Sequence, residues 1–103
     1  MPKVIITYRL KSGVTKDAFE TWVRERDQPT MRALKRVASF NTYRVEGPLF
    51  PDGPVTPQYV EIFDIPDLEG FGSEDVPGAV VQGVMGEFMG QVEAVEFLVA
   101  SEV

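Results

Sequence analysis

The sequence contains neither cysteine nor histidine. Without cysteine the chain can form no disulfide and offers no thiolate nucleophile. Without histidine it lacks the commonest general base, the commonest metal ligand and any catalytic triad built on an imidazole. No group of acids has the spacing of metal ligands, so we expect no metal and no other cofactor.

Long apolar runs are also missing. No stretch approaches the roughly 20 residues of a membrane-spanning helix, and the N-terminal segment has no signal-peptide pattern. We therefore expect a cytoplasmic protein with no membrane partner.

Basic residues are absent from the second half of the chain. All ten Lys and Arg lie within residues 1–44 beside four acids, whereas residues 45–103 hold twelve acids and no base. The bases form no continuous run, and the net charge of −6 would repel phosphate at long range. Our interpretation is that the two halves attract each other, within one subunit or across a dimer, and that nucleic acid is not a partner.

What is present fits one globular domain. The chain has 103 residues, of which 44% are hydrophobic, enough for one core and too few for two. We expect a single domain over residues 1–103. The residue patterns predict strands over 3–10, 38–47, 58–65 and 94–103, and helices over 15–27 and 79–92. The proline-rich segment 48–57 is predicted to be a loop, and 66–78 to be irregular with at most one helical turn.

The stretch "RERDQPTM" interrupts the first helix. Thr15 is a plausible N-cap, and the helical spacing from Phe19 places Arg26 on the inner face. Pro29 disfavours helical geometry at the residue before it. These residues predict that the helix ends or kinks near Asp27.

The order β-α-β-β-α-β predicts an α+β, ferredoxin-like fold, with a four-stranded antiparallel sheet and both helices on one face. We assign Val4, Ile6, Tyr8, Val60 and Ile62 to the helix-covered face. The helix-free face would then carry Ile5, Thr7, Arg9, Tyr59, Glu61 and Phe63. Such a mixed apolar face predicts a homodimer with twofold symmetry packed through it, although a monomer with a solvated sheet is the alternative.

Several stretches resemble a known superfamily. "FETWVRERDQPTMRAL", "SFNTYRV", "YVEIFDI" and "GSEDV" are similar to the dimeric α/β barrel proteins, closest to the REDY-like, HapK-like branch and with EthD-like features. The resemblance implies a ligand cleft between sheet and helices, and an association with prodiginine pigment biosynthesis. EthD-like proteins carry His-x-Pro where this chain has Asp27-Gln28-Pro29.

Because this chain lacks histidines that the superfamily uses, two of the superfamily's activities cannot be carried over to it. Polyketide cyclases use histidines at positions whose approximate counterparts are Val4 and Ala79, so their mechanism does not transfer. The haem-degrading relatives depend on a histidine ligand, so the resemblance gives no haem site.

The cleft implied by the resemblance would be apolar and aromatic. Its expected lining is Val4, Ile6, Phe19, Trp22, Val60, Ile62, Met85 and Phe88. The alternative is that these residues are simply the core. Gly83, Gly86 and Gly90 would either let the second helix pack closely or leave a cavity.

Two polar residues are candidates for proton chemistry. Tyr8 lies on the cleft side of the first strand, and Asp27 ends the first helix. A carboxylate buried in an apolar cleft acquires a raised pKa and can act as a general acid or base. The alternatives are a solvated or ion-paired Asp27 and a purely structural Tyr8.

Three functions remain open. The first is a cofactor-independent enzyme of aromatic, polyketide or prodiginine-like secondary metabolism, of cyclase, isomerase or oxygenase type, acting on a hydrophobic aromatic small molecule. The second is a non-catalytic accessory protein that binds a hydrophobic pathway intermediate. The third is a structural dimer whose interior is filled.

Overall fold

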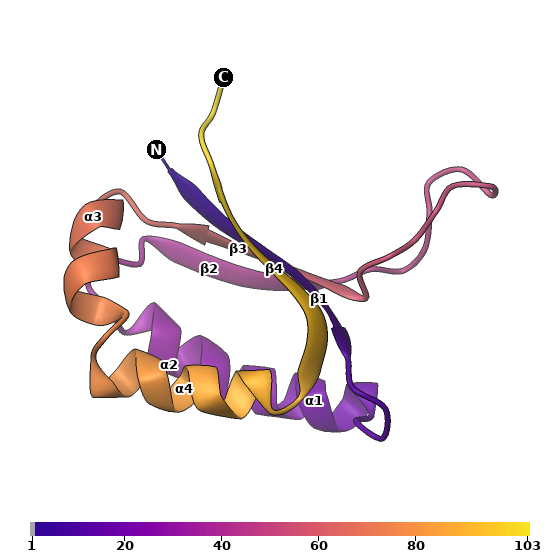
Figure 1. Ribbon diagram of the computed structural model, residues 1–103, viewed down its shortest axis with the longest axis horizontal. Coiled ribbons are helices and arrows are strands. Elements are labelled where there is room, and N and C mark those ends of the chain that lie inside the picture. Colours follow the sequence, from indigo (N-terminus) through magenta and orange to yellow (C-terminus); the bar gives the residue numbers. More distant parts are fainter. Residues whose placement is uncertain (1) are drawn as a thin grey trace.

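The computed structural model describes residues 2–103. Its four strands form one antiparallel sheet in the order β2-β3-β1-β4, which is the predicted ferredoxin-like arrangement. The helices lie together on one side of the sheet (Figure 1). The strands are β1 (Lys3–Leu10), β2 (Ser39–Arg44), β3 (Tyr59–Asp64) and β4 (Val92–Ala100). The helical segments are α1 (Lys16–Trp22), η1 (Val23–Asp27), α2 (Gln28–Arg32), α3 (Leu68–Gly70), η2 (Phe71–Asp75) and α4 (Ala79–Met89).

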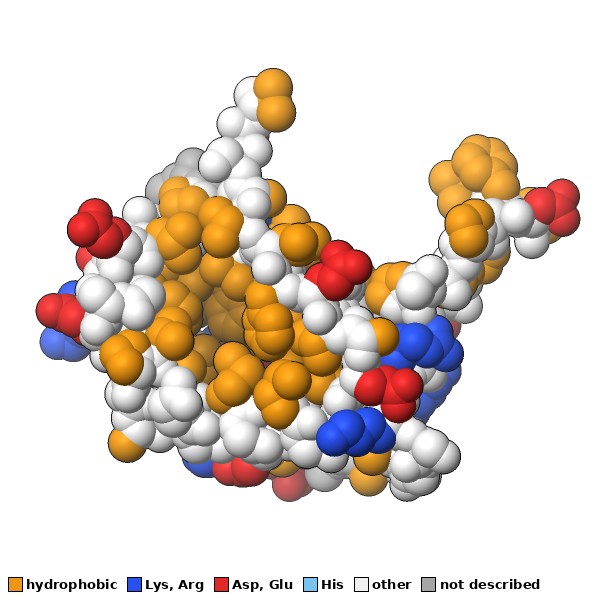
Figure 2. Space-filling model, viewed as in Figure 1, with side chains coloured by type: hydrophobic (Ala, Val, Ile, Leu, Met, Phe, Trp, Pro, Cys, Tyr) orange, Lys and Arg blue, Asp and Glu red, His pale blue; other side chains and the backbone are white. Residues whose placement is uncertain are grey.

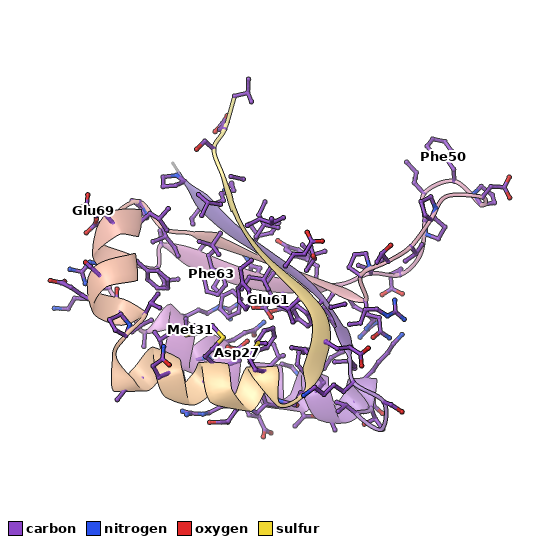
Figure 3. The ribbon with its side chains drawn as sticks, viewed as in Figure 1. Asp27, Met31, Phe50, Glu61, Phe63 and Glu69 are labelled. Atoms are coloured by element: carbon purple, nitrogen blue, oxygen red, sulfur yellow. The ribbon has the colours of Figure 1, made fainter. Side chains whose placement is uncertain are left out.

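Two long segments connect the main elements: one joins β2 to β3, and the other joins β3 to α4. The predicted loop is an arm that projects from the end of β2 and β3, with Phe50 far from the core (Figure 3). The segment before α4 is more regular than predicted, because α3 and η2 follow each other without a break. Among residues 2–103, none of the helices has both the length and the apolar character that crossing a membrane requires.

The first helix is disturbed next to Asp27, as predicted, but the chain stays helical there and continues as α2. Its N-cap is as predicted, since Thr15 Oγ1 accepts a hydrogen bond from Ala18 N at 3.2 Å. Gln28 remains helical, with φ −61° and ψ −49°. The chain passes Pro29 through a π-helical turn, η1, in which the Gln28 N–H donates to the Val23 carbonyl. Proline in a regular α-helix crowds the carbonyl four residues earlier, and the wider turn relieves that contact.

The π-helical turn also decides which residue faces the sheet. The buried residues of this long helix are Phe19, Val23, Asp27 and Met31, four apart each time. In a regular α-helix, each residue four positions further along is rotated by about 40° around the helix axis. The wider π-helical turn compensates for this rotation, so the four side chains keep the same direction. Arg26, which regular spacing assigned to the inner face, is therefore exposed, and Asp27 is buried in its place.

The register of β3 reverses its predicted faces. Glu61 lies beside Ile6, and Tyr59 lies beside Tyr8. Residues directly opposite each other on neighbouring strands project to the same face of the sheet. Tyr59 and Glu61 therefore face the helices.

Val60 and Ile62 lie on the helix-free face, where Ile62 is paired with Ile5. The prediction that they line the cleft is wrong. The other row of β3 carries the rings of Tyr59 and Phe63, which bury more apolar surface than a valine and an isoleucine. The larger side chains therefore take the core side.

Ion pairs join the basic first half to the acidic second half within one subunit, as the charge pattern predicted. Arg26 pairs with Glu87 at 3.0 Å, and Lys3 pairs with Asp64 at 2.6 Å. Arg36 contacts three acids around α3 and η2, namely Asp67, Glu74 and Asp75.

Two of the three glycines, Gly83 and Gly86, serve neither predicted purpose, and Gly90 is the C-cap of α4. A Cβ at Gly86 would meet nothing within 4 Å, and one at Gly83 would meet only the Arg26 guanidinium at 3.7 Å. Both residues lie on the exposed side of the helix. They neither allow close packing nor shape a cavity.

Replacing Gly86 by alanine should stabilise the protein. The change costs no space and reduces the backbone entropy lost on folding, so the free energy of unfolding should rise by about 0.5–1 kcal/mol in urea denaturation. Gly70→Ala is the contrasting variant, because its Cβ would meet Asp67 Oδ2 and lie 2.6 Å from Arg36 Nε. A destabilised Gly86→Ala protein would contradict the description of α4.

Candidate functional site

The inner face of β4 is not covered by a helix. Val99 and Phe97 are paired with Val4 and Ile6, which face the helices, yet Val99 is 65% exposed and Phe97 49% exposed. A hollow of about 330 Å³ remains between β4, η2 and α4, and Figure 2 shows it surrounded by hydrophobic side chains. It is lined by Val4, Ile6, Met31, Phe63, Ile65, Leu68, Phe71, Gly72, Val76, Val81, Met85, Phe97 and Val99.

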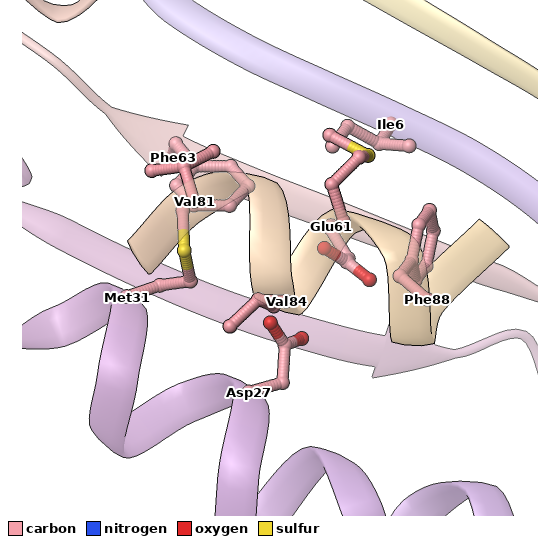
Figure 4. A pocket seen from close by; sticks show the side chains of 9 residues that line it. Ile6, Asp27, Met31, Glu61, Phe63, Val81, Val84 and Phe88 are labelled. Atoms are coloured by element: carbon pink, nitrogen blue, oxygen red, sulfur yellow. The ribbon is translucent and has the colours of Figure 1, made fainter. Parts of the chain in front are cut away.

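A smaller chamber of about 40 Å³ adjoins the hollow (Figure 4). The two spaces share Ile6, Met31, Phe63, Val81 and Met85 as lining residues. The chamber adds Asp27, Glu61, Val84 and Phe88. The apolar hollow thus leads to two carboxyl groups.

The two carboxyl groups come from facing layers. Asp27 is brought inward by η1 and Glu61 by β3, and their carboxyl groups point into the same space (Figure 4). Asp27 is 4% exposed and Glu61 3% exposed. Tyr8 Oη donates a hydrogen bond to Glu61 Oε2. Asp27 Oδ2 is buried with no hydrogen-bond partner among residues 2–103.

Burial has the largest effect on the pKa of Asp27. It disfavours the charged form and raises the pKa of this carboxyl from 3.8 to about 7. The Arg26 guanidinium lowers this pKa, and the charge of Glu87 raises it. Because Arg26 is itself paired with Glu87 outside the chamber, it offsets the burial only in part.

The pKa of Glu61 is raised in the same direction. Burial is the main cause, the charge of Asp27 adds to it, and the hydrogen bond from Tyr8 opposes it. Burial also raises the pKa of Tyr8 well above its usual range, with Glu61 as the second cause. Tyr8 therefore stays protonated and acts only as a donor to Glu61.

A buried pair of this kind suits proton transfer near neutral pH. Two neighbouring carboxyl groups that cannot easily ionise together present one base and one acid. Within residues 2–103, no three potential ligand side chains converge so that they could hold a metal ion. Two carboxyl groups in such an arrangement can serve general acid–base catalysis.

The comparisons with known proteins identify the family. The model of the family described as REDY-like protein HapK matches residues 2–103. The chain belongs to the REDY-like HapK family. The crystal structure of HapK from Hahella chejuensis is similar over 100% of this chain and 93% of that one, with 30% sequence identity and a TM-score of 0.79. No curated protein sequence matches the chain.

More distant likenesses show the fold alone. An EthD family protein from Bacillus halodurans is 16% identical, with a TM-score of 0.78, and the likeness covers 100% of this chain and 99% of that one. A protein of unknown function from Thermobifida fusca, described as dimeric and ferredoxin-like, is 14% identical, with a TM-score of 0.73, over 98% of this chain and 90% of that one. The HapK and EthD-like resemblance read from the sequence and the predicted fold are confirmed.

In this HapK-family chain, the predicted site residues fall into two groups. Asp27 lines the chamber together with Glu61, and Tyr8, which does not line it, donates a hydrogen bond to Glu61. The apolar residues that line the hollow or chamber as expected are Val4, Ile6, Met85 and Phe88.

Phe19 and Trp22 line neither space. Phe19 is fully buried in an aromatic cluster with Tyr8 and Tyr59. The Trp22 indole stacks on Phe88, and its N–H donates to a Glu87 oxygen at 2.9 Å on the outer side of the helices. Both residues fix the first helix to its neighbours rather than shaping the cleft.

Glu61 is the candidate site residue that the sequence did not predict. It was predicted to lie on the helix-free face, where a charged side chain is common and does not indicate a site. The indication in the sequence was its row, because Tyr59 and Phe63 are the aromatic residues of this segment and Ile65 shares their row. An acid within such a row is buried, and a buried acid is a candidate for function.

Proposed function

We propose that this HapK-family protein is a cofactor-independent enzyme of secondary metabolism that moves protons within a hydrophobic aromatic substrate, as an isomerase or cyclase does. The supporting observation is the apolar hollow that leads to a buried pair of carboxyl groups. Apolar walls with a few convergent polar groups are typical of small-molecule sites. This arrangement favours proton transfer over the oxygenase alternative, because it supplies an acid and a base.

The chemistry needs only groups that the chain provides. Ionised Asp27 removes a proton from one atom of the substrate, and protonated Glu61 gives its proton to another atom. The substrate is thereby isomerised without net gain or loss of protons. A proton exchange between the two carboxyl groups, directly or through water, restores the starting state. Tyr8 holds Glu61 in place through its hydrogen bond and does not itself react.

We also propose that the protein is a homodimer packed through the helix-free face. The apolar residues of that face are Ile5, Val60, Ile62 and Leu98, with Leu98 beside Ile5 across the β1–β4 pair. Covering this face by the same face of a second copy removes it from water. The dimeric description of the Thermobifida fusca protein supports this arrangement.

A generic substrate can test proton transfer before the natural one is known. 1-Indanone is flat and apolar, and it carries exchangeable protons beside its carbonyl group. In D₂O at pH 8 the protein should catalyse their exchange with saturation, as followed by proton NMR. Asp27→Asn should lower that rate by about 10²-fold or more, the usual contribution of a general base.

Glu69→Gln is the matched control, because it also removes one carboxylate. Glu69 is exposed on α3, away from the chamber, and this variant should exchange as fast as the wild type (Figure 3). Exchange that is equally fast with and without Asp27 would overturn the proposed mechanism. Binding of indanone without any exchange would favour a non-catalytic accessory protein.

A further inference from the structure

The chamber contains acids and no base. Among residues 2–103, its charged residues are Asp27 and Glu61, and no Lys or Arg of this part of the chain lines either the chamber or the hollow. The basic residue next to Asp27 is Arg26, which Glu87 holds on the outer side of α1 and α4. A negatively charged head group in the chamber would therefore meet two carboxyl groups and no counterion.

The sizes of the two spaces indicate which part of a ligand each of them could hold. The hollow of about 330 Å³ falls at the lower end of the range for small-molecule sites. The chamber of about 40 Å³ has room for one small polar group. A bound ligand would keep its apolar body between β4 and α4 and direct its polar head to the carboxyl groups.

The hydrogen bonds in the chamber indicate which polar group a ligand would place there. Glu61 Oε2 already accepts from Tyr8, whereas Asp27 Oδ2 accepts from nothing among the described residues. A buried acceptor without a partner costs free energy until a donor reaches it. The position facing Asp27 thus requires a hydrogen-bond donor.

The geometry points to a ligand class: an apolar, flat molecule that presents one N–H group, neutral or positively charged, and carries no carboxylate, sulfonate or phosphate. This inference rests on the proposed site and names what it accepts. The N–H would donate to Asp27 Oδ2.

Three naphthalene probes of nearly equal size test the inference. They are 2-naphthylmethylamine, 2-naphthylmethanol and 2-naphthoate, titrated with the full-length protein at pH 8 by calorimetry. The amine should bind about 10- to 100-fold more tightly than the naphthoate, as one hydrogen bond to a charged group implies, with the alcohol between them. Asp27→Asn should remove the advantage of the amine, and Glu69→Gln should keep it.

A second variant shows where the probes bind. Gly72 lines the hollow, and a Cβ added there would meet nothing within 4 Å, so Gly72→Leu should narrow the hollow while leaving the backbone in place. It should weaken the binding of all three probes about 10-fold or more, whereas Gly86→Leu on the exposed side of α4 should not.

The outcomes separate the inference from the proposed function. Equal affinities for amine and naphthoate, a preference for the naphthoate, or an amine preference that survives Asp27→Asn would overturn the ligand class and leave proton transfer standing. No binding of any probe to the wild-type protein would overturn the proposed small-molecule site itself, and the ligand class with it.

Discussion

The free energy of unfolding is expected to fall by about 3 kcal/mol or more between pH 5 and pH 9. Asp27 has its pKa raised from 3.8 to about 7 in the folded protein. Between these values the folded state keeps a proton that the unfolded state has already lost, so stability decreases as the pH rises through this window. The raised pKa of Glu61 acts in the same direction.

Few other groups contribute in this range. Glu20 has its pKa lowered to about 2, chiefly by its hydrogen bond from Arg44, and the pKa of Glu87 is also lowered. Lowered carboxyl pKa values add stability as the pH rises, but only in the acid range. The chain has no histidine. The α-amino group is the other group with an ordinary pKa inside the window.

Asp27→Asn isolates the contribution of the buried acid. This variant should show a shallower decrease with pH, and it should be more stable than the wild type at pH 9, because an amide carries no charge to bury. Urea denaturation at each pH measures both quantities. Identical pH dependence in the two proteins would show that Asp27 is not the buried group described here.

Replacing Ile62 by lysine is expected to convert the dimer into a monomer of 11.5 kDa. The lysine would lie in the middle of the helix-free face, beside Ile5, and dimerisation would bury its charge without a partner. The dissociation constant should rise by about 10³-fold or more, corresponding to at least roughly 4 kcal/mol. Sedimentation velocity at micromolar concentration measures the change.

Val80→Lys is the control for this experiment. Val80 is another β-branched apolar residue, and it is half exposed on α4, on the helix-covered side of the sheet. That variant should remain a dimer. A wild-type protein that is monomeric, or an Ile62→Lys protein that stays dimeric, would contradict the proposed interface.

The sequence predicted most of the fold because its patterns are local. The strands, the two main helices and the Thr15 cap follow from alternation, helical spacing and capping chemistry. β3 shows the limit of that reasoning. Both of its rows contain apolar residues, so the period of two gives the alternation but not which row faces the core. The size of Tyr59 and Phe63 indicates the buried row, and the pairing of Glu61 with Ile6 establishes it.

The site was harder to predict, because it depends on one non-standard turn. Regular helical spacing pointed Arg26 inward, and η1 buries Asp27 instead. The proline after it indicates a disturbed helix, but not whether the chain breaks, kinks or widens. π-Helical turns within α-helices are frequent at functional sites, and this one places the proposed base.

The central claim is that Asp27 and Glu61 are buried together with raised pKa values. Carbon-13 NMR of protein labelled at its Asp and Glu carboxyl carbons measures this directly, with Asp27→Asn and Glu61→Gln to assign the signals. A midpoint near pH 7 is expected for Asp27, and Asp27→Asn should lower the pKa of Glu61, because the charge of Asp27 raises it. An Asp27 signal that titrates near pH 4, like that of an exposed acid, would contradict the claim.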